Sequence, residues 1–329
     1  MLILSEAEVR ALLPLEQVIP LMEDALRAFS TGAVLQPVRQ ALRIAPYDGY
    51  LGLMPAHLRA PGGEALGAKA VTFYTGNAGR GLPTHMAVIL LWEPTTGTPL
   101  AMMDGRLITE LRTAAVSAAA TKALAAPEAG VLALLGAGVQ ARSHLAALRI
   151  VRPLRAVRVW SRTPERRRTF AGEMSDRDLS ITVCETPEAA VRGADLIVTA
   201  TSSPGPVLRG RWVTPGAHIN AVGAPRPDWR ELDGEAVAMA RVFVDSRAAA
   251  IVESGDVIQA LQEGAIEEDH IRGEIGDVFA GRLPGRTGPE EVTLFKSLGM
   301  AVEDVAAAAY VHALARERGA GREIDLEHG

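Results

Sequence analysis

The chain has 329 residues, a length typical of two domains, and 48% of them are apolar, which is enough to form a sizeable core. Its formal net charge of −5 comes without a basic stripe or an acidic tail, so we expect neither a nucleic acid nor a membrane as a partner. No apolar run is long enough to span a bilayer, and the single cysteine, Cys184, cannot form an internal disulfide. The N-terminus also lacks the basic start of a secretory signal, and together these features favour a cytoplasmic protein.

The first part of the chain predicts two helices followed by a hairpin and further strands. Ser5 and Glu8 have the spacing of a capping box, and a second helix is predicted from Leu15 to Ser30. The alternating stretch from Gln36 to Leu53 contains Tyr47-Asp48-Gly49, which is typical of a hairpin turn. Further strands are predicted at 65–74 and 85–92, with a loop at 75–83 and a long helix at 109–125.

A nucleotide-binding pattern begins at Val131. The apolar run Val131–Leu135 predicts a buried strand, and Ala156–Trp160 predicts a second strand after an intervening helix. Between them, Gly136-Ala137-Gly138-Val139-Gln140-Ala141 matches the G-x-G-x-x-A fingerprint, whose glycines allow a tight turn and the approach of a pyrophosphate. We expect a dinucleotide site formed by Gly136, Ala137, Gly138, Val139 and Gln140. A tight strand–helix turn in another kind of α/β domain is the alternative.

The end of the second strand indicates which dinucleotide is bound. An NAD site usually has a carboxylate here for the ribose hydroxyls, but this chain has Ser161-Arg162-Thr163. Two hydroxyls and a guanidinium suit a 2′-phosphate, so we expect NADP(H) to be preferred, with NAD(H) as the other possibility. The arginines that follow, Arg166 to Arg168, are more simply explained as the solvated face of a helix that begins at Pro164.

Alternating strands and helices continue beyond this unit and define the fold class. Strands are predicted at 181–184, 196–200, 219–222 and 242–244, with helices at 164–174 and 187–192. The alternation predicts a Rossmann-type doubly wound parallel sheet at 121–294. We expect a second, α+β domain for substrate binding and dimerisation at 1–120, completed by 295–329 with a helix from Ser297 to Glu317.

Three cations are candidates to bind an anionic substrate. Lys69 lies mid-strand among small and apolar residues, where a lysine is costly unless it has an anionic partner. Arg112 lies on a helix with small neighbours, and Arg39 is a third candidate for which a surface ion pair is the alternative. Cations around one pocket favour a carboxylate ligand, which arginine binds through two hydrogen bonds. His85 is either a proton donor or a core histidine.

Several motifs together make the chain resemble the ornithine cyclodeaminase/μ-crystallin family over nearly its full length. The motifs are Gly67-Ala68-Lys69, Met102-Met103-Asp104-Gly105, Leu111-Arg112-Thr113-Ala114-Ala115, the glycine-rich turn and Phe295-Lys296-Ser297-Leu298-Gly299. The run from His218 to Leu232 is most similar to the μ-crystallin branch, the ketimine reductases.

The resemblance implies a homodimer formed through the sheet of the first domain, and a substrate carboxylate bound by the three cations. The substrate-binding residues are then Arg39, Met54, Lys69, Thr84 and Arg112. The cofactor-binding residues beyond the glycine-rich turn are Ser161, Arg162, Thr163, Thr201 and Val222, the last of these near the nicotinamide. No metal site is expected.

One position departs from the family pattern. Cyclodeaminases and the related alanine dehydrogenases have an aspartate shortly after the glycine of the run that starts at His218, but here the position is Pro225. Asp228 is a catalytic candidate beside Lys69 and Arg112 if its loop folds back, although capping a helix is the more usual role for such a residue. The ornithine reaction therefore does not transfer with the resemblance.

We expect an NAD(P)H-dependent imine reductase that converts a small cyclic 2-imino carboxylate, such as Δ1-pyrroline-2-carboxylate or Δ1-piperideine-2-carboxylate, to the cyclic amino acid. One alternative is an ornithine cyclodeaminase or an alanine-dehydrogenase-like enzyme of the same family. The other is a protein that binds NADPH and a small ligand without turnover. Steady-state oxidation of NADPH by a cyclic imine separates the enzymes from the binding protein.

Overall fold

The computed structural model describes residues 1–60 and 63–326, which form two compact units. The first unit contains Met1–Arg112 and Met300–Gly329, and the second contains Thr113–Gly299. Each unit has its own eight-stranded sheet. The division between the units falls within helix α3 (Arg106–Leu124). No helix in the described part of the chain is long and apolar enough to cross a membrane.

The sheet of the first unit has the strand order β16-β1-β7-β6-β5-β4-β2, and β3 also pairs with β4. Its strands are β1 (Leu2–Leu4), β2 (Val34–Leu35), β3 (Gln40–Ile44), β4 (Gly49–Ala60), β5 (Gly63–Tyr74), β6 (His85–Trp92), β7 (Pro99–Asp104) and β16 (Arg322–Glu323). Consecutive strands from β3 to β7 pair antiparallel, whereas β1 and β7 run parallel. The predicted turn before β4 is confirmed, with Asp48 at a positive φ of 46°.

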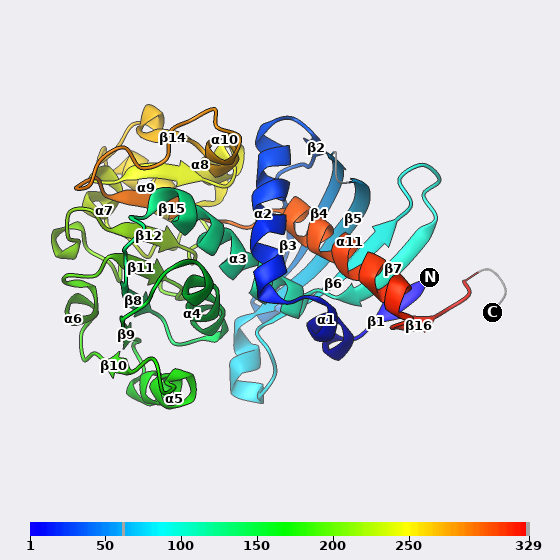
Figure 1. Ribbon diagram of the computed structural model, residues 1–329, viewed down its shortest axis with the longest axis horizontal. Helices are drawn as coiled ribbons and strands as arrows, with labels where there is room; N and C mark the ends of the chain where they lie inside the picture. Colours follow the sequence, from blue (N-terminus) through cyan, green and yellow to red (C-terminus); the bar gives the residue numbers. More distant parts are fainter. Residues whose placement is uncertain (61–62, 327–329) are drawn as a thin grey trace. The chain divides into compact units, whose positions relative to one another are not determined.

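Helices α2 (Leu15–Ser30) and α11 (Ala301–Arg318) lie across one face of this sheet, and α1 (Glu6–Leu12) packs against α11 and β7 (Figure 1). Ser5 and Glu8 form the predicted capping box at the start of α1. On the covered face, Met54, Lys69 and Ile89 lie side by side across β4, β5 and β6, and all three are buried. The covered face therefore carries the lysine singled out from the sequence.

The opposite face of the same sheet is apolar and exposed. Leu53, Ala70 and Val88 lie side by side on this face, because side chains alternate between the two faces of a strand. Its large apolar side chains are 41–61% exposed, and they are Leu42, Leu53, Met86 and Val88. We call these four residues the open sheet face. Contiguous exposed apolar surface of this kind is typical of a protein interface.

The second unit contains the predicted doubly wound sheet, with strand order β10-β9-β8-β11-β12-β15-β13-β14 and every pair parallel. Its strands are β8 (Val131–Leu135), β9 (Ala156–Trp160), β10 (Ile181–Val183), β11 (Leu196–Thr199), β12 (His218–Ala221), β13 (Arg241–Val244), β14 (Ile271–Glu274) and β15 (Thr293–Lys296). The order reverses between β8 and β11, which makes this pair the topological switch point.

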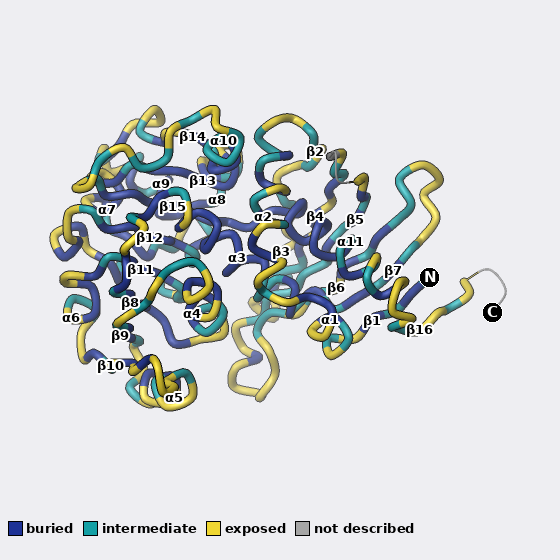
Figure 2. The backbone as a smooth tube through the Cα atoms, in the orientation of Figure 1, coloured by how far each residue is buried: buried dark blue, intermediate teal, exposed yellow. Residues whose placement is uncertain are grey.

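Helices separate the strands of the second unit and cover its sheet. They are the end of α3, then α4 (Val139–Val151), α5 (Pro164–Met174), α6 (Pro187–Val191), α7 (Gly234–Ala238), α8 (Arg247–Glu253), α9 (Gly255–Gln262) and α10 (Ile275–Phe279). Alternate residues of β8 enter different apolar clusters: Ala133 and Leu135 belong to one, and Leu132 and Leu134 to the other. The central strands are therefore buried, as their dark colour in Figure 2 shows.

The C-terminal part of the chain differs from its prediction. Residues Thr293–Lys296 form β15, which was not predicted, and the final helix begins at Ala301 rather than Ser297. The backbone N–H groups of Leu298 and Gly299 donate hydrogen bonds to Asp245 at 2.5 and 2.7 Å, so this segment is held in a non-helical conformation. The strand and the connection together return the chain from the second unit to the first.

Candidate active site

The turn between β8 and α4 leaves space for a phosphate group. Gly136 has a positive φ of 131°, and a Cβ there would lie 2.4 Å from the carbonyl oxygen of Ala200, so only glycine fits. Gly138 is the N-cap of α4 without a side-chain hydrogen bond, and a Cβ at this position would meet no atom within 4 Å. Uncapped N–H groups beside open space are the arrangement that binds a pyrophosphate at a helix N-terminus.

The other residues of the predicted cofactor set lie at the same edge of the sheet. Ala137, Val139 and Gln140 belong to the turn and the first turn of α4, and Val139 is 48% exposed. Thr201 follows β11, and Val222 follows β12. The carboxyl ends of parallel strands beside a switch point are where α/β sheets bind their ligands. The structure therefore brings these predicted residues to one edge.

The end of β9 carries no carboxylate. The hydroxyl of Ser161 donates to the carbonyl oxygen of Thr163 at 3.0 Å, and Arg162 is exposed, with no hydrogen bond or ion pair to the described residues. The sequence predicted that the arginines that follow lie on the solvated face of a helix, and for Arg167 this prediction is wrong. Arg167 is buried and donates to the carbonyl oxygen of Cys184 at 2.8 Å. Arg162 is thus the cation available to a phosphate here.

A buried acid–base network lies where β11 and β12 end. Glu231 accepts hydrogen bonds from the backbone N–H groups of Thr201 and Gly223 at 2.5 and 2.7 Å. Lys296 donates to the carbonyl oxygen of Gly223 and pairs with Asp256 at 2.9 Å. All three charged side chains are buried. Both polar backbone groups of Gly223 are therefore held by charged groups of the interior.

This network fixes the loop that follows β12. Burial and the neighbouring Asp256 raise the pKa of Glu231, against the opposing effects of Lys296 and the hydrogen-bond donors. A Cβ at Gly223 would lie 2.4 Å from the carboxyl carbon of Glu231, and Ala224 has a positive φ of 57°. Sequence reasoning gave no role to Glu231 or Asp256, and the only signal was a lysine, Lys296, inside an apolar run.

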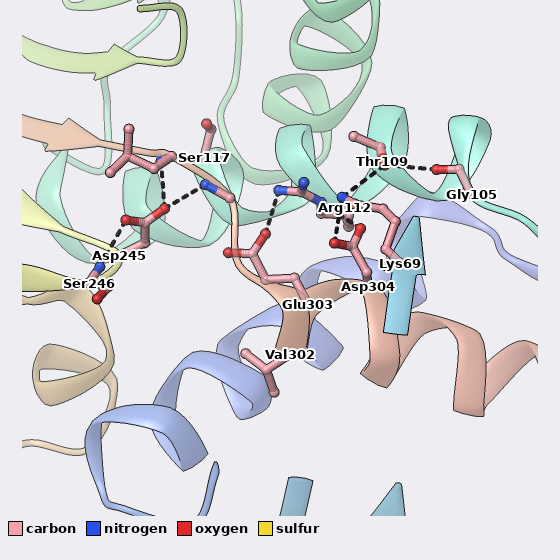
Figure 3. A network of polar contacts seen from close by, with 12 residues as sticks. Lys69, Gly105, Thr109, Arg112, Ser117, Asp245, Ser246, Val302, Glu303 and Asp304 are labelled. Atoms are coloured by element: carbon pink, nitrogen blue, oxygen red, sulfur yellow. Dashed lines mark hydrogen bonds and ion pairs between the residues drawn. The ribbon is translucent and has the colours of Figure 1, made fainter. Parts of the chain in front are cut away.

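The first unit holds a second buried cluster of charges, shown in Figure 3. Lys69 of β5 pairs with Asp304 of α11 at 2.5 Å and donates to the hydroxyl of Thr109 at 3.3 Å. Arg112 of α3 pairs with Glu303 at 2.6 Å and, through its Nε, with Asp304 at 3.1 Å. The four charged side chains are at most 5% exposed. The structure thus brings together two of the predicted substrate-binding cations.

The two acids of this cluster were missed by the sequence reasoning. They lie 191 and 192 residues from Arg112 along the chain, at the start of an alanine-rich helix. The signal available was that Glu303 and Asp304 interrupt an otherwise apolar segment next to Val302 and Val305. Lys69 was expected to need an anionic partner, and Asp304 is that partner.

The charges of the cluster shift one another's pKa values. Burial lowers the pKa of Lys69 to about 8, although Asp304 opposes this shift. Burial also disfavours charge on Arg112, but the two carboxylates outweigh it and raise the arginine's pKa. Burial opposes the charge of Asp304 in the same way, and the two cations nonetheless lower its pKa. At neutral pH Lys69, Arg112 and Asp304 are therefore charged, and Glu303 forms the second ion pair of Arg112.

The remaining predicted substrate residues lie on neighbouring strands. Met54 is buried beside Lys69, directly across the β4–β5 pair. Arg39 is half-buried and near enough to help lower the pKa of Lys69. His85 begins β6, directly after Thr84, and its pKa is lowered to about 4 by burial and by nearby cations, Lys69 first. His85 is therefore neutral at physiological pH and carries no imidazolium proton.

Asp228 belongs to the loop after β12, and its side chain pairs with Arg226. Its carboxylate forms two hydrogen bonds with Arg226, at 2.8 and 3.0 Å, and its side chain is 60% exposed. It does not cap a helix, since no helix begins next to it. The position after Gly223 and Ala224 is occupied by Pro225, so the loop itself offers no carboxylate there.

The sequence matches the ornithine cyclodeaminase/mu-crystallin family over residues 1–319. It is 48% identical to the ketimine reductase mu-crystallin of Mus musculus over 297 residues, which is 89% of this chain and 90% of that protein. Among solved structures, the Δ1-pyrroline-2-carboxylate reductase of Thermococcus litoralis, in complex with NADH and L-proline, superposes with a TM-score of 0.95. The two are 38% identical, and the match covers 98% of this chain and all of that one.

An archaeal alanine dehydrogenase dimer with bound NAD superposes with a TM-score of 0.93 at 36% identity, over 99% of both chains. Both matches cover at least 98% of this chain, so they extend over both units. The family match and the relatives agree with the resemblance indicated by the sequence motifs. This chain belongs to the ornithine cyclodeaminase/mu-crystallin family.

Proposed function

We propose that this protein is an NADPH-dependent reductase of small cyclic 2-imino carboxylates, such as Δ1-pyrroline-2-carboxylate or Δ1-piperideine-2-carboxylate. As a member of its family, the chain is a pyridine-nucleotide-dependent oxidoreductase that acts on carbon–nitrogen bonds. The observation that carries the finer proposal is the buried pair Lys69 and Arg112, because paired buried cations suit a carboxylate ligand. The relative crystallised with NADH and L-proline supports the cyclic substrate class.

The chain's own residues supply binding and orientation. Arg112 and Lys69, with Arg39, hold the substrate carboxylate, and Met54 and Thr84 shape the pocket around the ring. The nicotinamide, when bound, supplies the hydride that reduces the C=N carbon. Fixing the carboxylate orients that carbon, and orientation alone lowers the barrier to a bimolecular step substantially.

The preference for NADPH over NADH rests on Arg162. The end of β9 offers a guanidinium and two hydroxyl groups, from Ser161 and Thr163, where a carboxylate would bind the ribose of NAD. The relatives with solved structures contain NADH or NAD, so the choice of nucleotide is a property to measure on this chain.

We also propose a cytoplasmic homodimer formed through the open sheet face. Four large apolar side chains lie on it, and the related alanine dehydrogenase is a dimer. The substitution Val88→Asp places a charge in this face, and we expect it to convert a dimer into monomers in analytical ultracentrifugation. A wild-type protein that is monomeric at micromolar concentration would refute the dimer.

The function is tested by adding cyclic imines to the protein with NADPH and following nucleotide oxidation. We expect turnover with a cyclic 2-imino carboxylate, and little ammonia release from L-ornithine with NAD, because Pro225 supplies no carboxylate to the substrate nitrogen. Binding of NADPH and imine without oxidation would identify a binding protein instead. Ammonia release that disappears in Asp228→Asn would show that this aspartate serves a cyclodeaminase.

A further inference from the structure

We propose that Asp304 binds the nitrogen of the substrate, so that the site selects zwitterions, which carry a carboxylate and a protonated nitrogen on one carbon. This inference rests on the proposed function, because it concerns the same site. In the loop after β12, Pro225 stands at the position where the family pattern has an aspartate, and the carboxylates of Asp228 and Glu231 in that loop have partners of their own. The cluster in the first unit also contains the carboxylates of Glu303 and Asp304. Binding of a substrate carboxylate to Lys69 and Arg112 gives these two acids no role of their own.

The charges of the cluster are balanced before a ligand binds. Lys69 and Arg112 are already paired with Glu303 and Asp304, and the four buried charges sum to zero (Figure 3). A ligand that brings only a carboxylate adds a negative charge that these four groups leave uncompensated, and Arg39, half-buried and near Lys69, offsets it only in part, because a partly exposed charge is screened by water. A ligand with a carboxylate and an iminium or ammonium group adds no net charge. Neutrality therefore favours the zwitterion.

The two acids of the cluster differ in the cations that they contact. Asp304 touches both cations, Lys69 at 2.5 Å and Arg112 at 3.1 Å, whereas Glu303 has its ion pair with Arg112. When a substrate carboxylate binds Lys69 and Arg112, it replaces Asp304 as their partner. The carboxylate of Asp304 then lies next to the bound ligand. In a 2-imino carboxylate the nitrogen is one carbon away from the carboxylate, so it falls beside Asp304. Glu303 keeps Arg112 in place.

The chemical consequence is that the imine is held in its protonated, electrophilic form. A carboxylate beside the nitrogen stabilises an iminium cation. Arg39 and His85 are the other titratable groups near Lys69 and the cluster, and His85 is neutral because its pKa is lowered to about 4. The hydride then adds to carbon, the C=N π electrons move onto nitrogen, and no proton need be transferred during the step.

The test compares two ligands that differ in the charge on nitrogen. L-proline is a zwitterion, whereas pyrrole-2-carboxylate has a similar ring and an uncharged nitrogen. Both are titrated into the protein saturated with NADPH, which cannot react with either. In Asp304→Asn we expect the ratio of the Kd for L-proline to the Kd for pyrrole-2-carboxylate to rise about tenfold or more, the effect of a lost charge-assisted hydrogen bond.

Glu303→Gln is the matched control, because it removes the same charge from the same cluster and from the neighbouring residue. We expect pyrrole-2-carboxylate to bind this variant more tightly, because the lost negative charge compensates its carboxylate, and the ratio to rise clearly less than in Asp304→Asn, in which the contact to nitrogen is also lost. A ratio that is unchanged in Asp304→Asn, or that changes equally in both variants, would overturn the assignment of Asp304 while leaving the proposed function intact. Binding of neither ligand to the wild type would overturn both.

If Asp304→Asn does not fold, the inference is tested on the wild-type protein instead. Calorimetry in buffers with different ionisation enthalpies gives the protons taken up on binding. We expect pyrrole-2-carboxylate to take up more protons than L-proline, because its unbalanced charge must be neutralised within the cluster. Lys69, with a pKa of about 8, is one group of the cluster that can take up this proton. Equal uptake for the two ligands contradicts the inference.

Discussion

The residues of the candidate site differ in how visible they are in the sequence. Lys69 and Arg112 stand out because charges among small apolar neighbours need partners, and the structure buries both. Their partner acids come from the far end of the chain and show no local pattern that links them to the cations. A pairing between distant residues is set by the fold, so it could not be predicted from either segment alone.

The fork of Arg112 gives the first prediction. Its Nε and one terminal nitrogen each contact a different carboxylate, and a lysine offers a single point charge that cannot reproduce this geometry. We expect Arg112→Lys to lower kcat/KM for the imine at least about a hundredfold, with little change in the Kd of NADPH. Steady-state kinetics and fluorescence titration check this. Full activity in a folded Arg112→Lys protein would remove the arginine from the site.

Arg162 gives the second prediction. The Arg162 side chain is exposed and has no partner among the described residues. Its removal should therefore leave the free energy of unfolding unchanged and weaken only the binding of the 2′-phosphate. We expect Arg162→Ala to narrow the difference in binding free energy between NADPH and NADH by about 1.5–3 kcal/mol, the size of a charged hydrogen bond. Arg166→Ala, in the first turn of α5, is the control. Equal affinities of the wild type for both nucleotides would show the preference to be wrong.

At the scale of elements, regular patterns were predicted well and irregular ones were not. The alternation of apolar strands and helices from Val131 to Val191 predicted β8, β9 and α5 to within a residue or two. Strand β15 was missed because it is short and ends in Lys296, which reads as a surface residue unless its buried partner Asp256 is known. A short strand with a charged residue whose partner lies on another segment lacks the alternation of apolar and polar residues that marks a strand.

The loop after β12 gives a prediction at this scale. A Cβ at Gly223 would lie 2.4 Å from both the Glu231 carboxyl carbon and the carbonyl oxygen of Thr201, so Gly223→Ala must displace the loop. We expect a loss of about 1–3 kcal/mol in the free energy of unfolding and weaker nucleotide binding. Denaturant unfolding and NADPH titration measure these. Gly138→Ala has open space, so its Cβ should leave unfolding unaffected.

At the scale of the whole molecule, both units bury neutral histidines. The pKa of His85 is lowered to about 4 in the first unit, and in the second unit the pKa values of His144 and His218 are lowered to about 4 and about 3, in each case mainly by burial. An unfolded histidine titrates near pH 6.5, so the unfolded chain takes up these protons first as the pH falls. Stability from these groups is complete above about pH 6.5 and decreases toward pH 4.

We therefore expect the melting temperature to fall progressively between pH 6.5 and pH 4.5, before the carboxylates titrate in the unfolded chain. His144 bonds the hydroxyl of Ser117 and the carbonyl oxygen of Gln140 inside the second unit. The variant His144→Gln should lose less stability over this pH range than the wild type, by roughly 1–3 kcal/mol. Calorimetric melting curves across the range provide the measurement. A melting temperature that is constant from pH 6.5 to pH 4.5 would contradict the expectation.

The first unit is assembled from both ends of the chain, and this affects how the protein is made. Its final 30 residues, Met300–Gly329, follow the whole of the second unit. During translation the second unit can fold as soon as it leaves the ribosome, but the sheet of the first unit then waits for α11 and β16. Lys69 and Arg112 are synthesised early and receive Asp304 and Glu303 only at the end. A ribosome that stops short of α11 thus releases a chain that has its glycine-rich turn but lacks both acids of the buried charge cluster.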